Sequence, residues 1–216
     1  MTAPDHLRVW LEVRDATPWH RVRRTPPEAQ AIIPLRDGPA HDIRTRDHRR
    51  DPVRAARLLA ALARARADAE SGAVLGFEVL SAWQRCVLDV AEAPFRARPA
   101  FAKGGRERYG AGPGLRDRFE RCLAQAHDPE LPLPARAARL YLDVCFFHPF
   151  DDGNARSAFL ALTFLLARSG VALDQVAPVR SLPRRADDPE DALALADLVA
   201  ILIANTARRG RVSTPF

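Results

Sequence analysis

One helix has to lie at the centre of any fold that this chain adopts. Beyond Ser157, the stretch from Asn154 to Ser169 is apolar on almost every face, with Thr163 as the main exception. A helix that is apolar all round is buried among other elements. Gly170 follows at the position where a left-handed residue commonly ends a helix. We therefore predict a central helix over residues 154–169.

A second helical pattern leads directly to this helix. Over about residues 135–147, apolar side chains recur at helical spacing, which predicts a helix with one buried face. Pro149 cannot continue that helix beyond His148, because proline lacks an N–H and its ring clashes with the preceding turn. The chain has to turn here, between two buried helices. Burial of both helices would hold the turn rigidly, as catalysis by positioning demands.

The turn contains groups that suit phosphate chemistry. Asp151 or Asp152 can cap the following helix, and Gly153 allows a ligand to approach the backbone closely. The free N–H groups at a helix N-terminus bind anions, and Arg156 adds forked donors for phosphate oxygens. Either aspartate can hold Mg²⁺ together with the phosphates of a substrate. His148, with an ordinary pKa of about 6.5, is available as a general base near neutral pH.

These residues resemble the motif of the Fic-domain family, His-Pro-Phe-x-Asp/Glu-Gly-Asn-Gly-Arg-x-x-Arg. The matching positions are His148, Pro149, Phe150, Asp152, Gly153, Asn154 and Arg156. Ala155 stands where the family has its second glycine, and it keeps the backbone N–H that an anion site needs. Phe159 stands where the family has a second arginine. The chain therefore lacks a cation that in the family contacts the terminal phosphate of ATP.

The resemblance implies an all-α fold, namely a Fic-type helical bundle with a short β-hairpin called the flap. It implies a Mg²⁺-dependent transferase that moves AMP from ATP to a Ser, Thr or Tyr hydroxyl of a target protein, which is called AMPylation or adenylylation. It implies His148 as the catalytic base, Asp152 as the Mg²⁺ ligand and Phe150 as an anchor in the core. The phosphate-binding residues that it implies are Gly153, Asn154, Ala155 and Arg156.

Other interpretations of the motif stay open. One branch of the family, similar to the Doc toxin, lacks the same two residues and transfers the terminal phosphate of ATP to its target. Proteins of that branch carry a lysine where this chain has Ala155, so the similarity is partial, and the missing lysine favours AMP transfer. The chain is alternatively a non-catalytic nucleotide-binding or partner-binding module, or a transferase with another phosphorylated donor. Without a function, the turn would only join two helices.

A hairpin is predicted ahead of the motif. Residues 100–109 form two short extended arms around a Gly-Gly pair, which is a hairpin signal. In Fic proteins the flap lies ahead of the motif and binds a loop of the target by strand addition. The residues that we assign to a target-binding flap are Ala102, Lys103, Gly104, Gly105 and Arg106. Its basic side chains equally suit an exposed, solvated turn.

The remaining patterns predict one domain with extended ends. We assign residues 1–49 to a mostly irregular N-terminal extension, residues 50–207 to the Fic-type domain and residues 208–216 to a basic tail. Within the extension, Leu7 to Val13 is either a strand or a short helix, and residues 20–50 are expected to form a solvated loop. The inhibitory pattern Ser/Thr-x-x-x-Glu-Gly/Asn of some Fic proteins is absent from the sequence. Any restraint is therefore expected to come from a separate inhibitory or antitoxin chain, or from another mechanism.

Composition favours a cytoplasmic protein without nucleic-acid or membrane partners. The net charge is +6, but acidic residues are interleaved with the 33 basic ones, so neither a basic patch nor a nucleic-acid partner is expected. Three cysteines without metal-like spacing favour small buried side chains in a reducing compartment. Near the first residues no apolar run typical of a secretory signal occurs, and other apolar runs are too short to span a bilayer.

Overall fold

Helices dominate the computed structural model, which describes residues 4–23, 32 and 34–212. The longer helices are α1 (His6–Ala16), α4 (Pro52–Glu70), α5 (Phe77–Leu88), α6 (Leu115–Ala124), α7 (Leu133–Phe147), α8 (Asn154–Arg168) and α10 (Pro189–Val212). The shorter ones are η1 (Trp19–Arg21), α2 (Gly38–Asp42), η2 (Ile43–Asp47), α3 (His48–Arg50), η3 (Gln125–His127) and α9 (Ala177–Ser181). Strands β1 (Ala100–Ala102) and β2 (Glu107–Tyr109) pair with each other. The predicted all-α fold with one short hairpin is confirmed.

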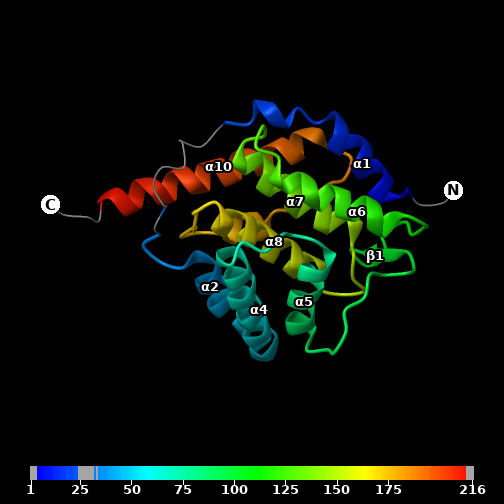
Figure 1. The fold of residues 1–216 in the computed structure, drawn as a ribbon, viewed down its shortest axis with the longest axis horizontal. Helices are drawn as coiled ribbons and strands as arrows, with labels where there is room; N and C mark the ends of the chain where they lie inside the picture. Colours follow the sequence, from blue (N-terminus) through cyan, green and yellow to red (C-terminus); the bar gives the residue numbers. More distant parts are fainter. Residues whose placement is uncertain (1–3, 24–31, 33, 213–216) are drawn as a thin grey trace.

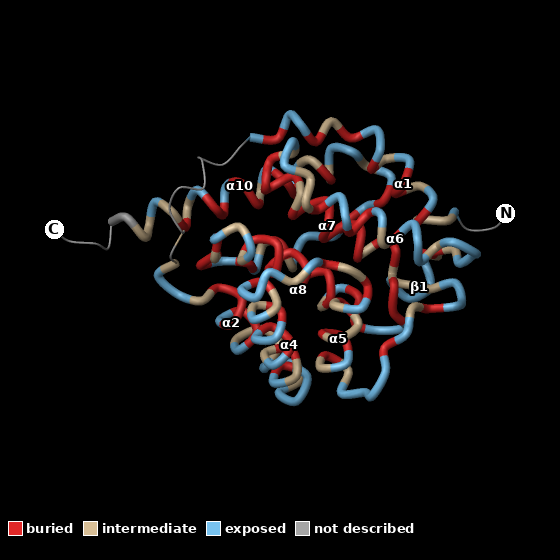
Figure 2. The backbone as a smooth tube through the Cα atoms, in the orientation of Figure 1, coloured by how far each residue is buried: buried red, intermediate tan, exposed pale blue. Residues whose placement is uncertain are grey.

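The helix α8 lies at the centre of the fold. It packs against α7 on one side and against α4 and α5 on the other (Figure 1). Every residue from Ser157 to Leu166 is buried. Figure 2 shows the buried residues gathered where α7 and α8 meet. The prediction of a central helix is confirmed, and it follows from the lack of a polar face on this segment. None of the described helices combines the length and the apolar character needed to cross a membrane.

A buried ion pair fastens α1 to α7. Asp143 of α7 is fully buried and accepts hydrogen bonds from the Nε and Nη2 of Arg14, at 2.7 and 3.0 Å. The indole N–H of Trp10 donates to the same carboxylate at 3.0 Å. Since the polar groups of Asp143 and Arg14 are satisfied by each other, α1 can present a charged residue to the interior.

The prediction that residues 1–49 are mostly irregular is wrong for the described part. Asp5 caps α1 by accepting from the N–H of Leu7, and α2, η2 and α3 form a nearly continuous helical stretch from Gly38 to Arg50. The expected solvated loop is therefore largely helical, although residues 24–31 and 33 lie outside the described residues. The apolar periodicity was weak because charged side chains such as Arg14 and Asp42 occupy inward positions. The predicted domain limits at residues 50 and 207 stay a prediction.

The segment assigned to a basic tail is helical at its start. Helix α10 continues through Arg208 and Arg209 to Val212. Arg209 is anchored on the buried Asp174, with its Nε 2.5 Å and its Nη2 2.6 Å from the two carboxylate oxygens. This long-range ion pair, which no local pattern reveals, supports the last turns of the helix.

The hairpin is present at the predicted place. Ala100 pairs with Tyr109 and Ala102 with Glu107 in an antiparallel register. Between the strands, Gly104 and Gly105 have φ angles of 68° and 85°, which glycine adopts without strain. Within β2, Glu107 and Tyr109 are buried on one face, so the hairpin presents these two side chains to the body of the protein.

Candidate active site

One cavity of about 770 Å³ gathers the predicted motif residues. Its walls come from the end of α3 and the start of α4, from the hairpin, from α7 and α9, and from the turn between α7 and α8. The motif residues that line it are His148, Asp152, Gly153, Asn154, Ala155 and Arg156. The structure thus places the predicted base, metal ligand and phosphate-binding residues around one space.

The backbone at His148 ends α7 in a left-handed conformation. The φ and ψ of His148 are 47° and 58°, and its N–H donates to the carbonyl of Val144 at 3.3 Å. The imidazole Nδ1 forms a hydrogen bond with the carbonyl oxygen of Cys145. Because a carbonyl can only accept, Nδ1 carries the proton in the neutral ring and Nε2 carries the lone pair. Nε2 is therefore the atom that can accept a proton.

The surroundings of His148 favour its neutral form. Burial lowers its pKa below the ordinary value, and the nearby guanidinium of Arg96 lowers it further. The hydrogen bond to the Cys145 carbonyl and the carboxylate of Glu107 oppose this shift without reversing it. A lowered pKa leaves the imidazole unprotonated at neutral pH, which is the state that a general base requires.

Tyr109 of the hairpin lies flat on the imidazole of His148. The ring centroids are 4.2 Å apart and the ring planes differ by 14°. The Tyr109 hydroxyl donates to Glu107 at 2.6 Å, and the same carboxylate accepts from the Nζ of Lys103 at 2.7 Å. Lys103 also donates to the carbonyl of Arg184 at 3.0 Å. This chain of contacts joins the hairpin to the base and to the segment after α9.

Arg96 connects the same hairpin to the backbone of the motif turn. Its Nε donates to the carbonyl of His148 at 2.7 Å, and its Nη2 donates to the carbonyl of Phe147 at 3.0 Å. Nη2 also donates to the carbonyl of Gly110, the residue after β2, at 2.7 Å. Because one rigid guanidinium holds carbonyls of both segments, the position of His148 is tied to that of the hairpin.

Gly153 cannot be replaced by a larger residue without disturbing the turn. Its φ is 78°, and a Cβ at this position would lie 2.5 Å from the Nε2 of Gln84. Gln84 of α5 is fully buried, donates to the carbonyl of Asp152 and accepts from the hydroxyl of Ser157, at 2.5 Å in each case. The turn is thus fixed to α5 through one amide side chain.

The side chain of Asn154 forms hydrogen bonds with the backbone of the turn itself. Its Oδ1 accepts from the N–H of Phe150 at 3.0 Å, and its Nδ2 donates to the carbonyl of the same residue at 2.8 Å. Phe150 is buried and stacks on Phe77 of α5, with centroids 5.4 Å apart. Asn154 and Phe150 therefore shape the turn, and what Asn154 offers to a ligand is its backbone.

The N-terminus of α8 presents free donors beside a carboxylate and a cation. Within the described chain, the N–H groups of Asn154 and Ala155 have no hydrogen-bond partner. Asp152 accepts from the N–H of Gly153 at 2.6 Å, and its other oxygen lies 3.1 Å from the Nη2 of Arg156. Free N–H groups at the positive end of a helix form a site for an anion such as phosphate.

The hairpin residues assigned to target binding fall into two groups. Ala102 and Lys103 line the cavity, whereas Gly104, Gly105 and Arg106 are exposed at the tip and do not line it. Arg106 donates to the carbonyl of Lys103 at 3.0 Å. The basic tip therefore contributes one cation, Lys103, to the cavity wall.

Sequence reasoning missed four residues that hold the site together: Gln84, Arg96, Glu107 and Tyr109. The sequence contained a local signal for Glu107 and Tyr109, and a weaker one for Gln84. Glu107 and Tyr109 alternate along one arm of the hairpin, so they share a face. Gln84 is a polar residue four positions after the buried Leu80, where the apolar pattern expects a core side chain. Arg96 lies in an irregular segment and has no such signal.

Comparisons with known proteins find Fic proteins. Residues 90–166 match the family model described as the Fic/DOC family. A Fic domain-containing signalling protein from Bacteroides thetaiotaomicron is 14% identical with a TM-score of 0.57, and the alignment covers 94% of each chain. A segment of Fic-1 from C. elegans is also 14% identical, with a TM-score of 0.54 over 97% of this chain and 73% of that chain. At this identity both structures support the fold alone. Among curated proteins, none matches the chain.

Proposed function

Because this chain contains a Fic domain, we propose that it is a Fic-type transferase that moves AMP from ATP to a hydroxyl side chain of a target protein. One observation carries the proposal. The neutral imidazole of His148 and the free N–H groups at the start of α8 line the same cavity. A base and an anion site that face one space suit the attack of a hydroxyl on a bound phosphate.

The reaction follows from the roles of these groups. The Nε2 of His148 takes the proton of a Ser, Thr or Tyr hydroxyl, and the oxygen attacks the α-phosphorus of ATP. The new bond joins this oxygen to AMP, while the bond to the β-phosphate breaks and pyrophosphate leaves. The N–H groups of Asn154 and Ala155 and the guanidinium of Arg156 are placed to stabilise the negative charge on the phosphates.

The residues present fit a Mg²⁺ ion. The Asp152 side chain is 68% exposed and faces the cavity, and its two known hydrogen bonds leave lone pairs free. Magnesium in phosphate sites is commonly held by one or two carboxylates together with substrate phosphates. Asp152 would hold the ion, which when bound would neutralise charge on the phosphates.

The hairpin could bind a segment of the target protein along the free edge of β1. In the described residues, β1 pairs with β2 along one side, so its other edge is open to an added strand. The β1 residue Phe101 is 62% exposed and lines the cavity. A target segment that pairs with β1 would therefore bring its hydroxyl close to His148.

Phosphorylation of the target is the second candidate function, because Phe159 replaces the arginine that the family uses to orient ATP. In that reaction the hydroxyl attacks the γ-phosphorus and ADP leaves. Transfer from another phosphorylated donor and a non-catalytic binding role are the remaining candidates, and the absence of label from both forms of ATP in the following experiment would favour these two.

Labelled ATP tests the proposal. The purified chain is incubated with Mg²⁺, a cell lysate and ATP labelled at either the α- or the γ-phosphate, with a His148→Asn variant as the control. We expect protein bands labelled from the α form alone and absent with the variant. Label from the γ form alone would instead establish phosphorylation. The lack of any His148-dependent label from either form, with the protein folded, would contradict transfer from ATP.

A further inference from the structure

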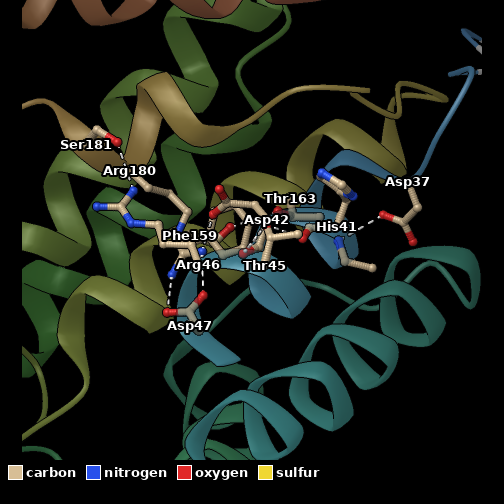
Figure 3. A network of polar contacts seen from close by, with 11 residues as sticks. Asp37, His41, Asp42, Thr45, Arg46, Asp47, Phe159, Thr163, Arg180 and Ser181 are labelled. Atoms are coloured by element: carbon tan, nitrogen blue, oxygen red, sulfur yellow. Dashed lines mark hydrogen bonds and ion pairs between the residues drawn. The ribbon is translucent and has the colours of Figure 1, made fainter. Parts of the chain in front are cut away.

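A cation from another helix covers the motif position that lost its arginine. Phe159 is fully buried in α8, and the guanidinium carbon of Arg180 from α9 lies 4.6 Å from the centroid of its ring. Figure 3 shows Arg180 beside Phe159, and it shows Asp47 next to the guanidinium of Arg180, with which it forms an ion pair. The aromatic ring thus serves as a platform that supports a guanidinium.

Arg180 faces the same cavity as the phosphate-binding turn. It lines this cavity together with Gly153 and Arg156. Phe159 follows Asn154 by five positions in α8, which corresponds to roughly 7–8 Å along the helix axis. A single phosphate at the start of α8 would not extend along that distance. A phosphate-bearing ligand that contacts both places therefore needs more than one phosphate group.

The guanidinium of Arg180 forms ion pairs with two carboxylates. Its Nη1 and Nη2 lie 2.7 and 3.0 Å from the two carboxylate oxygens of Asp47, and Nη1 also pairs with Asp42. The cluster of one cation and two anions has a net charge of −1, which disfavours a phosphate nearby. Asp47 lines the cavity, whereas Asp42 does not and is 7% exposed. Asp47 is thus the partner that a ligand in the cavity would meet.

The backbone that carries Asp47 is unusual. Residues Ile43–Asp47 form a π-helical turn between α2 and α3. Such turns are rare and are found frequently at functional sites, because the extra residue changes the direction of the side chains that follow. Here the turn ends at the carboxylate that faces both Arg180 and the cavity.

We propose that Arg180 binds the terminal phosphate of the donor and that Asp47 competes with this phosphate for the guanidinium. The inference rests on the proposed function, since it concerns the donor of that same site. Asp42 keeps Arg180 in place, and Asp47 yields when the phosphate binds. The cavity consequently selects a donor with two or more phosphates, and its affinity for that donor is held down by a carboxylate of the same chain.

A binding titration tests the role of Arg180 without requiring transfer. The whole chain is titrated with ATP, ADP and AMP in the presence of Mg²⁺ by calorimetry. Losing charge-assisted hydrogen bonds to a phosphate corresponds to about a tenfold or larger loss of affinity. We expect this loss for ATP in Arg180→Met, a smaller loss in Arg180→Lys and unchanged binding of AMP in both.

Variants of the carboxylates separate binding from stability. Arg180→Met leaves two acids without their cation, so Asp47→Asn provides a test in which Arg180 keeps Asp42. We expect Asp47→Asn to bind ATP more tightly and AMP equally. Asp37→Asn is the matched control, because Asp37, at the start of α2, forms a similar pair with Arg66 at 2.6 Å but does not line the cavity. It is expected to change neither affinity.

The outcomes distinguish this inference from the proposed function. If the wild type binds ATP and both folded Arg180→Met and Asp47→Asn bind it equally well, the role of Arg180 is wrong while transfer from ATP survives. If the wild type transfers nothing from ATP but binds inorganic tripolyphosphate through Arg180, the phosphate site stands and the proposed donor is wrong. No binding of either compound by the wild type and by Asp47→Asn would overturn both.

Discussion

Replacing His148 with asparagine is expected to slow transfer by about 10²–10⁴-fold, the usual contribution of a general base. Asparagine cannot accept the proton of the target hydroxyl, but among non-glycine residues it tolerates the left-handed backbone of this position comparatively well. The variant therefore removes the base and preserves the end of α7. The measurement is the initial rate of AMP transfer with saturating ATP and Mg²⁺.

Nucleotide binding is the control for this variant. Since the free N–H groups at the start of α8 and Arg156 are untouched, ATP is expected to bind His148→Asn with the affinity of the wild type. A variant that binds ATP and transfers AMP at the rate of the wild type would show that another group accepts the proton.

Replacing Asp143 with alanine is expected to lower the free energy of unfolding by about 3–5 kcal/mol, because the change leaves the buried cation of Arg14 without its partner. The loss would loosen α1 from α7, the helix that delivers His148 to the cavity. Urea unfolding followed by circular dichroism measures the effect. The replacement Glu12→Ala on α1 is the control, since the Arg8–Glu12 pair is exposed and is expected to contribute little.

A double substitution tests the cause of this loss. If the unpaired charge is responsible, Arg14→Met together with Asp143→Leu should restore much of the stability that the single change removes. An unfolding free energy for Asp143→Ala within experimental error of the wild type would contradict the account of how α1 is held.

Much of the central fold follows from local patterns. The all-round apolar character of residues 157–166 predicted the burial of α8, and the Gly-Gly pair predicted the hairpin. Both signals are local, because burial on every face and a left-handed turn each select particular residue types. The N-terminal helices were missed because Arg14 and Asp42 occupy inward positions. Their partners, Asp143 and Arg180, lie more than a hundred residues away in the sequence.

The candidate site was predictable to the extent that it is continuous in sequence. The motif turn brings its base, its glycine and its cation within nine residues, from His148 to Arg156. The groups that fix the turn come from elsewhere: Gln84 from α5, and Arg96 and Tyr109 from the segment that carries the hairpin. Arginine and glutamine are common on surfaces, so their type alone does not reveal a buried positioning role.

The pH dependence of AMP transfer tests the central claim most directly, namely that His148 is the general base. Burial lowers the pKa of His148, so the neutral imidazole persists to a lower pH than in an exposed histidine. The rate is therefore expected to stay level from neutral pH downward and to fall to half only below about pH 6.5, the ordinary histidine pKa. His148→Asn should show no such decline in its residual rate. A wild-type rate that is already half-lost above that pH, or an identical decline in the variant, would contradict the assignment of His148 as the base.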